Sequence, residues 1–132
     1  MPVNSTQPTK RSINSRAKGK RCELEACKKI MEHIGGKARR SVQYCGRMYD
    51  GAGGSADILW DDRVHIEVKA NEQLNIDVAL DQAKNDAREG QIPLVLHKKN
   101  KKPWKVTVDL VDILSLSKII SEYTPKTSNS QD

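Results

Sequence analysis

The sequence Ala56-Asp57-Ile58-Leu59-Trp60, followed closely by Val64-His65-Ile66-Glu67-Val68-Lys69-Ala70, decides the fold. Both stretches are typical of β-strands, and Asp61-Asp62 between them is typical of a tight turn. Alternate side chains of a strand share a face, so Glu67 and Lys69 point the same way. The opposite face of the second strand then points into the core and consists of Ile66, Val68 and Ala70.

Pairing of these strands across the turn would place Asp57 beside Glu67. Two carboxylates so placed repel each other unless a cation lies between them, and Mg²⁺ fits because it prefers hard oxygen ligands. Such an ion lowers the pKa of a bound water and stabilises charge on a phosphate in the transition state. Lys69 could orient or help deprotonate that water, or neutralise the developing charge. The pattern therefore predicts a metal-dependent site for phosphate chemistry.

A simpler interpretation remains open, because an amphipathic strand with a solvated face also shows Glu-x-Lys spacing. Glu23 favours the metal site. Gly19 to Ile34 is a predicted helix, and Glu23 precedes Cys27 and Ile30 by four and seven residues, at the edge of the apolar stripe. A carboxylate turned towards the core needs a reason, and a shared metal would supply one.

The remaining elements complete an α/β domain with a mixed sheet flanked by helices, in the order helix, three strands, helix, two strands, helix. We expect Asn75 to cap the second helix and Gly90 to stop it. The predicted ranges are strand Arg40 to Cys45, loop Asp50 to Ser55, helix Ile76 to Glu89, strands Ile92 to Leu96 and Trp104 to Leu110, and helix Val111 to Tyr123.

The net charge of +6 lies in an N-terminal arm, because Met1 to Cys22 holds six basic residues and no acidic one. The rest of the chain then has 17 basic and 17 acidic residues. We expect residues 1–17 to be a flexible basic arm, 18–123 the folded domain and 124–132 a flexible tail. The arm suits a polyanion such as nucleic acid, or is a solubilising tail.

Several classes of protein are not expected. No apolar run approaches the roughly 18 residues that span a bilayer, and no signal peptide is evident, so a cytoplasmic protein is expected. Three cysteines without a CxxC pair and three histidines without metal-ligand spacing predict neither a zinc site nor disulfides. With two Trp, three Tyr and no Phe, a base-stacking platform for single strands is not expected either.

These residues and their order resemble the PD-(D/E)xK nuclease superfamily, and more closely archaeal-type Holliday-junction resolvases and their phage relatives. The similarity covers about Lys18 to Val108. Ala56 stands where the name-giving proline would be, and many members lack that proline. The motifs that carry the resemblance are Lys18-Gly19-(x)₃-Glu23, Arg40, Ser55-Ala56-Asp57-Ile58, Ile66-Glu67-Val68-Lys69 and Pro93-Leu94-Val95.

The resemblance implies a restriction-endonuclease-like core (αβββαββ) in which Glu23, Asp57 and Glu67 bind Mg²⁺ and Lys69 is the catalytic lysine. Mn²⁺ would substitute for Mg²⁺. It also implies a homodimer that cuts symmetric strands of a four-way DNA junction, in the host cytoplasm if the protein is phage-encoded.

Candidate DNA contacts follow from charge and from the resemblance, although each of these residues could equally be a solvated surface side chain. The glycine-rich loop Gly51 to Gly54 lacks the Gly-Lys-Ser/Thr of a nucleotide-binding loop. Two other functions stay open: a nuclease of this fold acting on linear or flapped DNA in restriction or packaging, and a non-catalytic DNA-binding module. The candidate contacts are Lys18, Lys20, Arg21, Arg40, Arg47, Gln82, Lys98, Lys99, Lys101 and Lys102.

Overall fold

The computed structural model describes residues 7–41 and 56–123 and shows a five-stranded mixed sheet with strand order β1-β2-β3-β4-β5. The central pair β3–β4 is parallel, and the other neighbouring pairs are antiparallel. A parallel pair needs a crossover connection, which the helix between β3 and β4 provides. The strands are β1 (Arg39–Arg40), β2 (Ile58–Leu59), β3 (Val64–Lys69), β4 (Ile92–His97) and β5 (Lys105–Thr107).

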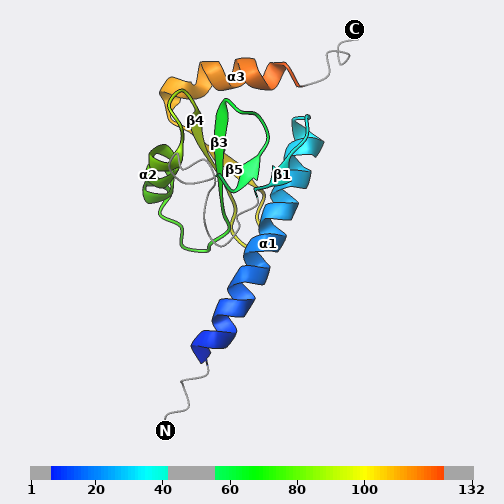
Figure 1. The fold of residues 1–132 in the computed structure, drawn as a ribbon, viewed down its shortest axis with the longest axis vertical. Helices are drawn as coiled ribbons and strands as arrows, with labels where there is room; N and C mark the ends of the chain where they lie inside the picture. Colours follow the sequence, from blue (N-terminus) through cyan, green and yellow to red (C-terminus); the bar gives the residue numbers. More distant parts are fainter. Residues whose placement is uncertain (1–6, 42–55, 124–132) are drawn as a thin grey trace.

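Helices cover both faces of the sheet, so the described part of the chain has three layers (Figure 1). One face packs on α1 and α3 through a core that includes Ile30, Ile66 and Leu116. The other face packs on α2 through Ala79, Leu80, Ala83 and Val95. No described helix has the length and apolarity needed to cross a membrane. The helices are α1 (Gln7–His33), α2 (Ile76–Asp86), the 3₁₀ helix η2 (Leu110–Asp112) and α3 (Ile113–Ser121).

The α/β class with a mixed sheet, predicted from the element order, is confirmed. The predicted N-cap is also confirmed, because Oδ1 of Asn75 accepts a hydrogen bond from the Val78 backbone N–H at 3.1 Å. Helix α2 ends at Asp86, three residues before the predicted end, and Gly90 follows with a positive φ of 90°.

The predicted start of the first helix was wrong. Helix α1 begins at Gln7 rather than near Gly19, so residues 7–17, which we expected to form a flexible arm, continue the helix. Pro8 lies in the first turn of the helix, where proline is tolerated, and Gly19, farther along α1, costs only about 1 kcal/mol. With 27 residues, α1 is about 40 Å long, and its N-terminal half extends beyond the sheet (Figure 1).

Two further strand boundaries differ from the prediction. Strand β5 is shorter than predicted, and the final helix is preceded by the separate turn η2. Strand β1 contains only Arg39–Arg40. The rest of the strand predicted to reach Cys45, the loop from Asp50 to Ser55, and Arg47 lie outside the described residues.

The end of α1 is attached to the C-terminal end of α3. The indole N–H of Trp60 donates to the carbonyl of Gly35 at 3.0 Å, and the rings of Trp60 and Tyr123 lie 4.7 Å apart. The Tyr123 hydroxyl donates to the Asp61 carboxylate. Gly36, with a φ of 78°, lies so close that an added Cβ would be 2.8 Å from the Tyr123 ring. This contact keeps both helices on one face of the sheet.

Candidate active site

Asp57 and Glu67 meet at the junction of β2 and β3. Ile58 lies opposite Ile66 in the antiparallel register, and the Asp57 backbone N–H donates to the Ile66 carbonyl at 2.9 Å. The Val68 N–H in turn donates to Oδ2 of Asp57 at 2.8 Å. These bonds fix the Asp57 carboxyl group against β3, beside the side chain of Glu67.

The pKa of Asp57 reveals the electrostatic cost of this arrangement. Burial raises it from an ordinary 3.8 to about 7, the hydrogen bond from the Val68 N–H lowers it, and the neighbouring charges of Glu67 and Glu23 raise it further. A side-chain hydrogen bond with Glu67 adds to the rise. Without a cation, the Asp57 carboxyl is therefore about half protonated at neutral pH, mainly because burial disfavours its charged form and further because Glu67 and Glu23 lie nearby.

Glu67 is almost completely buried, at 3% exposed, on the β3 face that packs against α2. Its Oε2 atom lies 2.8 Å from Nε2 of His65, which is equally buried. Asp86, the last residue of α2, brings a third possible ligand, and one ligand atom from each of the three lies within 4.8 Å of the others.

His65 and Asp86 were not among the site residues predicted from the sequence. The strand alternation that put Glu67 and Lys69 on one face also puts His65 there, so this partner was within reach of the sequence. Asp86 comes from another layer of the fold, and no local pattern connects it with β3.

Glu23 has a cationic partner in this structure. Its Oε1 accepts from Nε of Arg40 at 2.9 Å, and both side chains are half-buried. Arg40, a predicted phosphate contact, is therefore engaged with a carboxylate. Glu23 nevertheless raises the pKa of Asp57, so it lies within electrostatic reach of the Asp57–Glu67 pair.

Lys69 ends β3 on the same face as Glu67. Its Nζ donates to Oε1 of Gln82 on α2 at 3.1 Å. Both residues were candidates from the sequence, Gln82 as a DNA contact on a helix where related nucleases often have a glutamine near the site, and the structure places them against each other. Gln82 thus restrains the lysine ammonium at the edge of the site.

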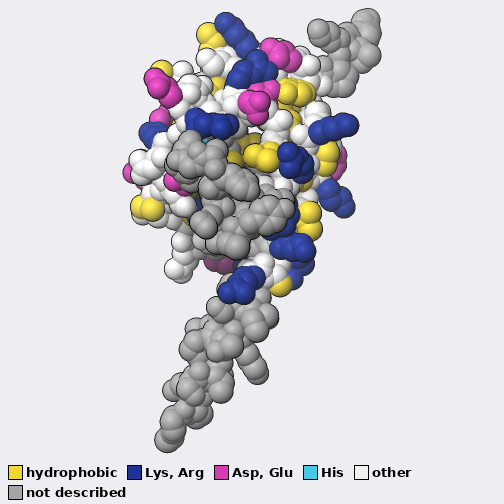
Figure 2. Space-filling view, viewed as in Figure 1, with side chains coloured by type: hydrophobic (Ala, Val, Ile, Leu, Met, Phe, Trp, Pro, Cys, Tyr) yellow, Lys and Arg dark blue, Asp and Glu magenta, His cyan; other side chains and the backbone are white. Residues whose placement is uncertain are grey.

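The basic hairpin between β4 and β5 begins next to this site, because the Lys98 N–H donates to the Lys69 carbonyl at 3.1 Å. The Lys98 ammonium lies 3.6 Å from the Glu25 carboxylate and above the Trp104 ring, so its charge is partly satisfied. Figure 2 shows basic side chains on the face where α1 leaves the body. The exposed basic candidates on the hairpin and α1 are Lys99, Lys101, Lys102, Lys18, Lys20 and Arg21.

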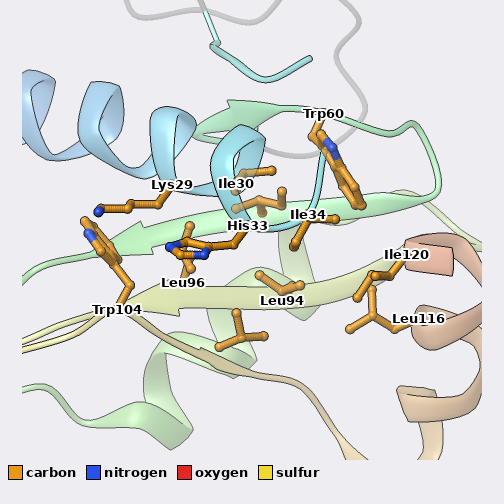
Figure 3. A pocket seen from close by; sticks show the side chains of 12 residues that line it. Lys29, Ile30, His33, Ile34, Trp60, Leu94, Leu96, Trp104, Leu116 and Ile120 are labelled. Atoms are coloured by element: carbon orange, nitrogen blue, oxygen red, sulfur yellow. The ribbon is translucent and has the colours of Figure 1, made fainter. Parts of the chain in front are cut away.

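A separate pocket of about 240 Å³ lies between α1, the sheet and α3, and its wall is mostly apolar. Figure 3 shows Trp60 and Trp104 at its two ends, with Lys29 and His33 contributed by α1. None of the described residues that line it carries a carboxylate. The pocket therefore does not supply the chemistry that the Asp57–Glu67 pair offers.

The chemistry of the donor set fits a hard divalent cation. Asp57 and Glu67 supply adjoining carboxyl oxygens, Glu23 adds a third carboxylate nearby, and burial together with these neighbouring charges raises the pKa of Asp57. A lysine ammonium at the end of the same strand can face a phosphate bound there. Together these groups are suited to hydrolysis of a phosphate ester.

The mixed sheet, its crossover helix, and Asp57 directly before β2 with Glu67 and Lys69 on β3 define a restriction-endonuclease-like fold. Residues 14–131 match a family model described as "Phage putative PDDEXK endonuclease", so the chain belongs to this phage family of the PD-(D/E)xK nuclease superfamily. Neither the curated proteins nor the solved structures contain a match.

Proposed function

We propose that the protein is a Mg²⁺-dependent DNA endonuclease that hydrolyses phosphodiester bonds, with four-way junctions as its preferred substrate. One observation carries this proposal: the carboxyl groups of Asp57 and Glu67 lie next to each other, close to the end of β3 where Lys69 lies. Membership of the PD-(D/E)xK family supports the reaction class.

In this proposal Asp57 and Glu67 hold the ion, with Glu23 reaching it directly or through water. The bound ion would acidify a water and stabilise charge on the phosphate. Lys69 orients the attacking water or neutralises charge on the phosphate oxygens, and Gln82 keeps its ammonium in place until DNA arrives. Mn²⁺ should replace Mg²⁺, because the same oxygen ligands suit both ions.

Charge on the described surface supports DNA as the substrate. The hairpin lysines Lys99, Lys101 and Lys102 follow the strand adjoining Lys69, and the exposed basic side chains of α1 directly precede Glu23. Contacts of this kind bind phosphates and carry no base specificity by themselves. They suit recognition of shape, which is what a junction presents.

The junction preference and the homodimer rest on the resemblance to resolvases, since symmetric cuts need two active sites. Two alternatives compete with it: a nuclease of the same fold for linear or flapped DNA, and a DNA-binding module without catalysis. The buried pair of Asp57 and Glu67 argues against the binding module. Burying two neighbouring carboxyl groups lowers the stability of the fold, and DNA binding alone would not require them.

The deciding experiment is cleavage of end-labelled four-way junction, linear duplex, flap and single-stranded DNA, with Mg²⁺ and with EDTA. Paired symmetric nicks confined to the junction and abolished by EDTA are expected. Cutting of every substrate would remove the resolvase and keep the nuclease. Tight binding without cleavage under Mg²⁺ or Mn²⁺ would leave the binding module.

Matched variants assign the residues. Asp57→Asn and Glu67→Gln should abolish cleavage while DNA binding survives or tightens, whereas Asp62→Asn, an exposed aspartate of the nearby turn, should cut normally. Equal loss of activity in all three variants would contradict the assignment.

The contribution of α1 to binding is tested by neutralising its basic side chains, which leaves the helix intact. Replacing Lys18, Lys20 and Arg21 by Gln should weaken DNA binding. It should also reduce the slope of log K against log salt by about 0.9 for each phosphate that these side chains neutralise in the wild-type complex. An unchanged slope would mean that this part of α1 does not touch phosphates.

A further inference from the structure

The layer between β3 and α2 contains a second group of possible metal ligands beneath the proposed magnesium site. His65 and Glu67 point into this layer from β3, and Asp86 approaches from the end of α2. Ala79 and Ala83, both buried, pack with Val95 of the neighbouring β4, so that α2 lies close to the sheet. One nitrogen and two carboxylate oxygens thereby converge within 4.8 Å of one another.

This group brings two carboxylates, those of Glu67 and Asp86, to one imidazole, that of His65. Glu67 and His65 are each 3% exposed, so water solvates them poorly, and burying charge is costly unless it is paired. Glu67 also faces the carboxyl of Asp57 on its other side. The neighbouring α2 lysine, Lys84, is paired with Asp109 at 2.7 Å, and Lys69 is directed at Gln82.

We propose that His65, Glu67 and Asp86 bind a second divalent cation, distinct from the ion between Asp57 and Glu67, with Glu67 shared between the two sites. An imidazole nitrogen with two carboxylates suits Mn²⁺, Co²⁺ or Zn²⁺ better than Mg²⁺, which prefers oxygen ligands throughout. Asp86 is only half-buried, so the ion enters from the C-terminal end of α2.

The second ion would act on the first site through Glu67. By occupying Oε2, the oxygen nearest His65, it leaves the other carboxylate oxygen for the ion shared with Asp57. It would also tie the end of α2 to β3 and so stabilise the crossover unit. The second site can be tested separately from the proposed nuclease activity, because two of its three ligands, His65 and Asp86, have no part in the proposed catalytic site.

The test is metal binding by the full chain, measured by calorimetric titration with Mn²⁺ and by the visible absorption of bound Co²⁺. Wild type should bind two Mn²⁺ ions per chain and show Co²⁺ bands shaped by a nitrogen ligand. His65→Gln and Asp86→Asn should each lose one ion, with affinity for it at least 10-fold weaker, and His65→Gln should lose the nitrogen-dependent bands. Asp57→Asn should lose the other ion and keep those bands.

Two controls separate ligand loss from damage to the fold. His33→Gln, an exposed histidine of α1, should bind as wild type, and far-UV circular dichroism must show native helix content in every variant. Asp86→Asn changes a half-buried helix end and keeps the test valid if His65→Gln fails to fold.

If both His65→Gln and Asp86→Asn keep every ion that wild type binds, the second site is overturned and His65 is left as a hydrogen-bonding partner of Glu67. Absence of DNA cleavage together with two bound ions would refute the nuclease alone. The two proposals can therefore fail independently.

Discussion

Replacing Asp57 by Asn should make the metal-free protein more stable, although it removes a side chain on which the proposed reaction depends. The amide keeps an oxygen that accepts the Val68 N–H, so the hydrogen bond at 2.8 Å can persist. The negative charge, which burial and the neighbouring Glu67 and Glu23 make costly, is gone. The wild-type aspartate would thus lower the stability of the metal-free protein, although the proposed reaction depends on it.

The magnitude follows from the pKa of about 7 against an ordinary 3.8. At about 1.4 kcal/mol for each pH unit of displacement, ionising Asp57 costs the folded protein up to about 4 kcal/mol more than the unfolded chain. A carboxyl with a raised folded pKa binds protons more tightly in the folded state. Its favourable contribution is therefore complete below pH 4 and is lost as the pH rises through 7.

The assay is thermal and urea unfolding in EDTA from pH 4 to 8, with Asp62→Asn as the control for an exposed aspartate. The stability advantage of Asp57→Asn over wild type should grow between pH 4 and 7 and stay constant above 7. The melting temperature at pH 8 should rise by several degrees, and Mg²⁺ should stabilise wild type but not the variant. An advantage that is absent, or flat across this range, would refute the reasoning.

Three further variants test separate features. Lys69→Met should reduce cleavage at least about 100-fold with Mg²⁺ binding unchanged, while exposed Lys118→Met cuts normally; equal activity of both would exclude a catalytic lysine. Gly36→Ala should cost about 2–3 kcal/mol in urea unfolding, because its Cβ would lie 2.8 Å from the Tyr123 ring at a φ of 78°; an unchanged midpoint would contradict this. Tyr123→Phe should cost about 1 kcal/mol by losing its hydrogen bond to Asp61, without changing cleavage rates; an undiminished melting temperature would show that this bond contributes nothing.

Features set by local periodicity were predictable from the sequence. The alternation along β3 placed Glu67 and Lys69 on one face, and the tight turn after β2 brought Asp57 to the same strand. Asn75 was identified as a cap because its side chain acts on a backbone group three residues away. Each of these depends on neighbours along the chain.

Features set by contacts between layers were not predictable in the same way. The Arg40–Glu23 ion pair joins a strand to a helix, and Asp86 reaches His65 across the β3–α2 layer. The start of α1 was missed for a different reason. Residues 7–17 lack an apolar stripe, and the continuation of a helix from an already packed segment needs none.

The alternation of side chains along β3 limits how this strand can change during evolution. Its even-numbered residues from Val64 pack against α1 and α3, while His65, Glu67 and Lys69 face α2 and the proposed site. Deleting or inserting one residue between the turn and Lys69 would exchange the two sets. The residues of the proposed site would then face α1 and α3, and the apolar residues would face α2. Evolution can therefore vary this strand by substitution but not by length, and differences in length should accumulate outside it.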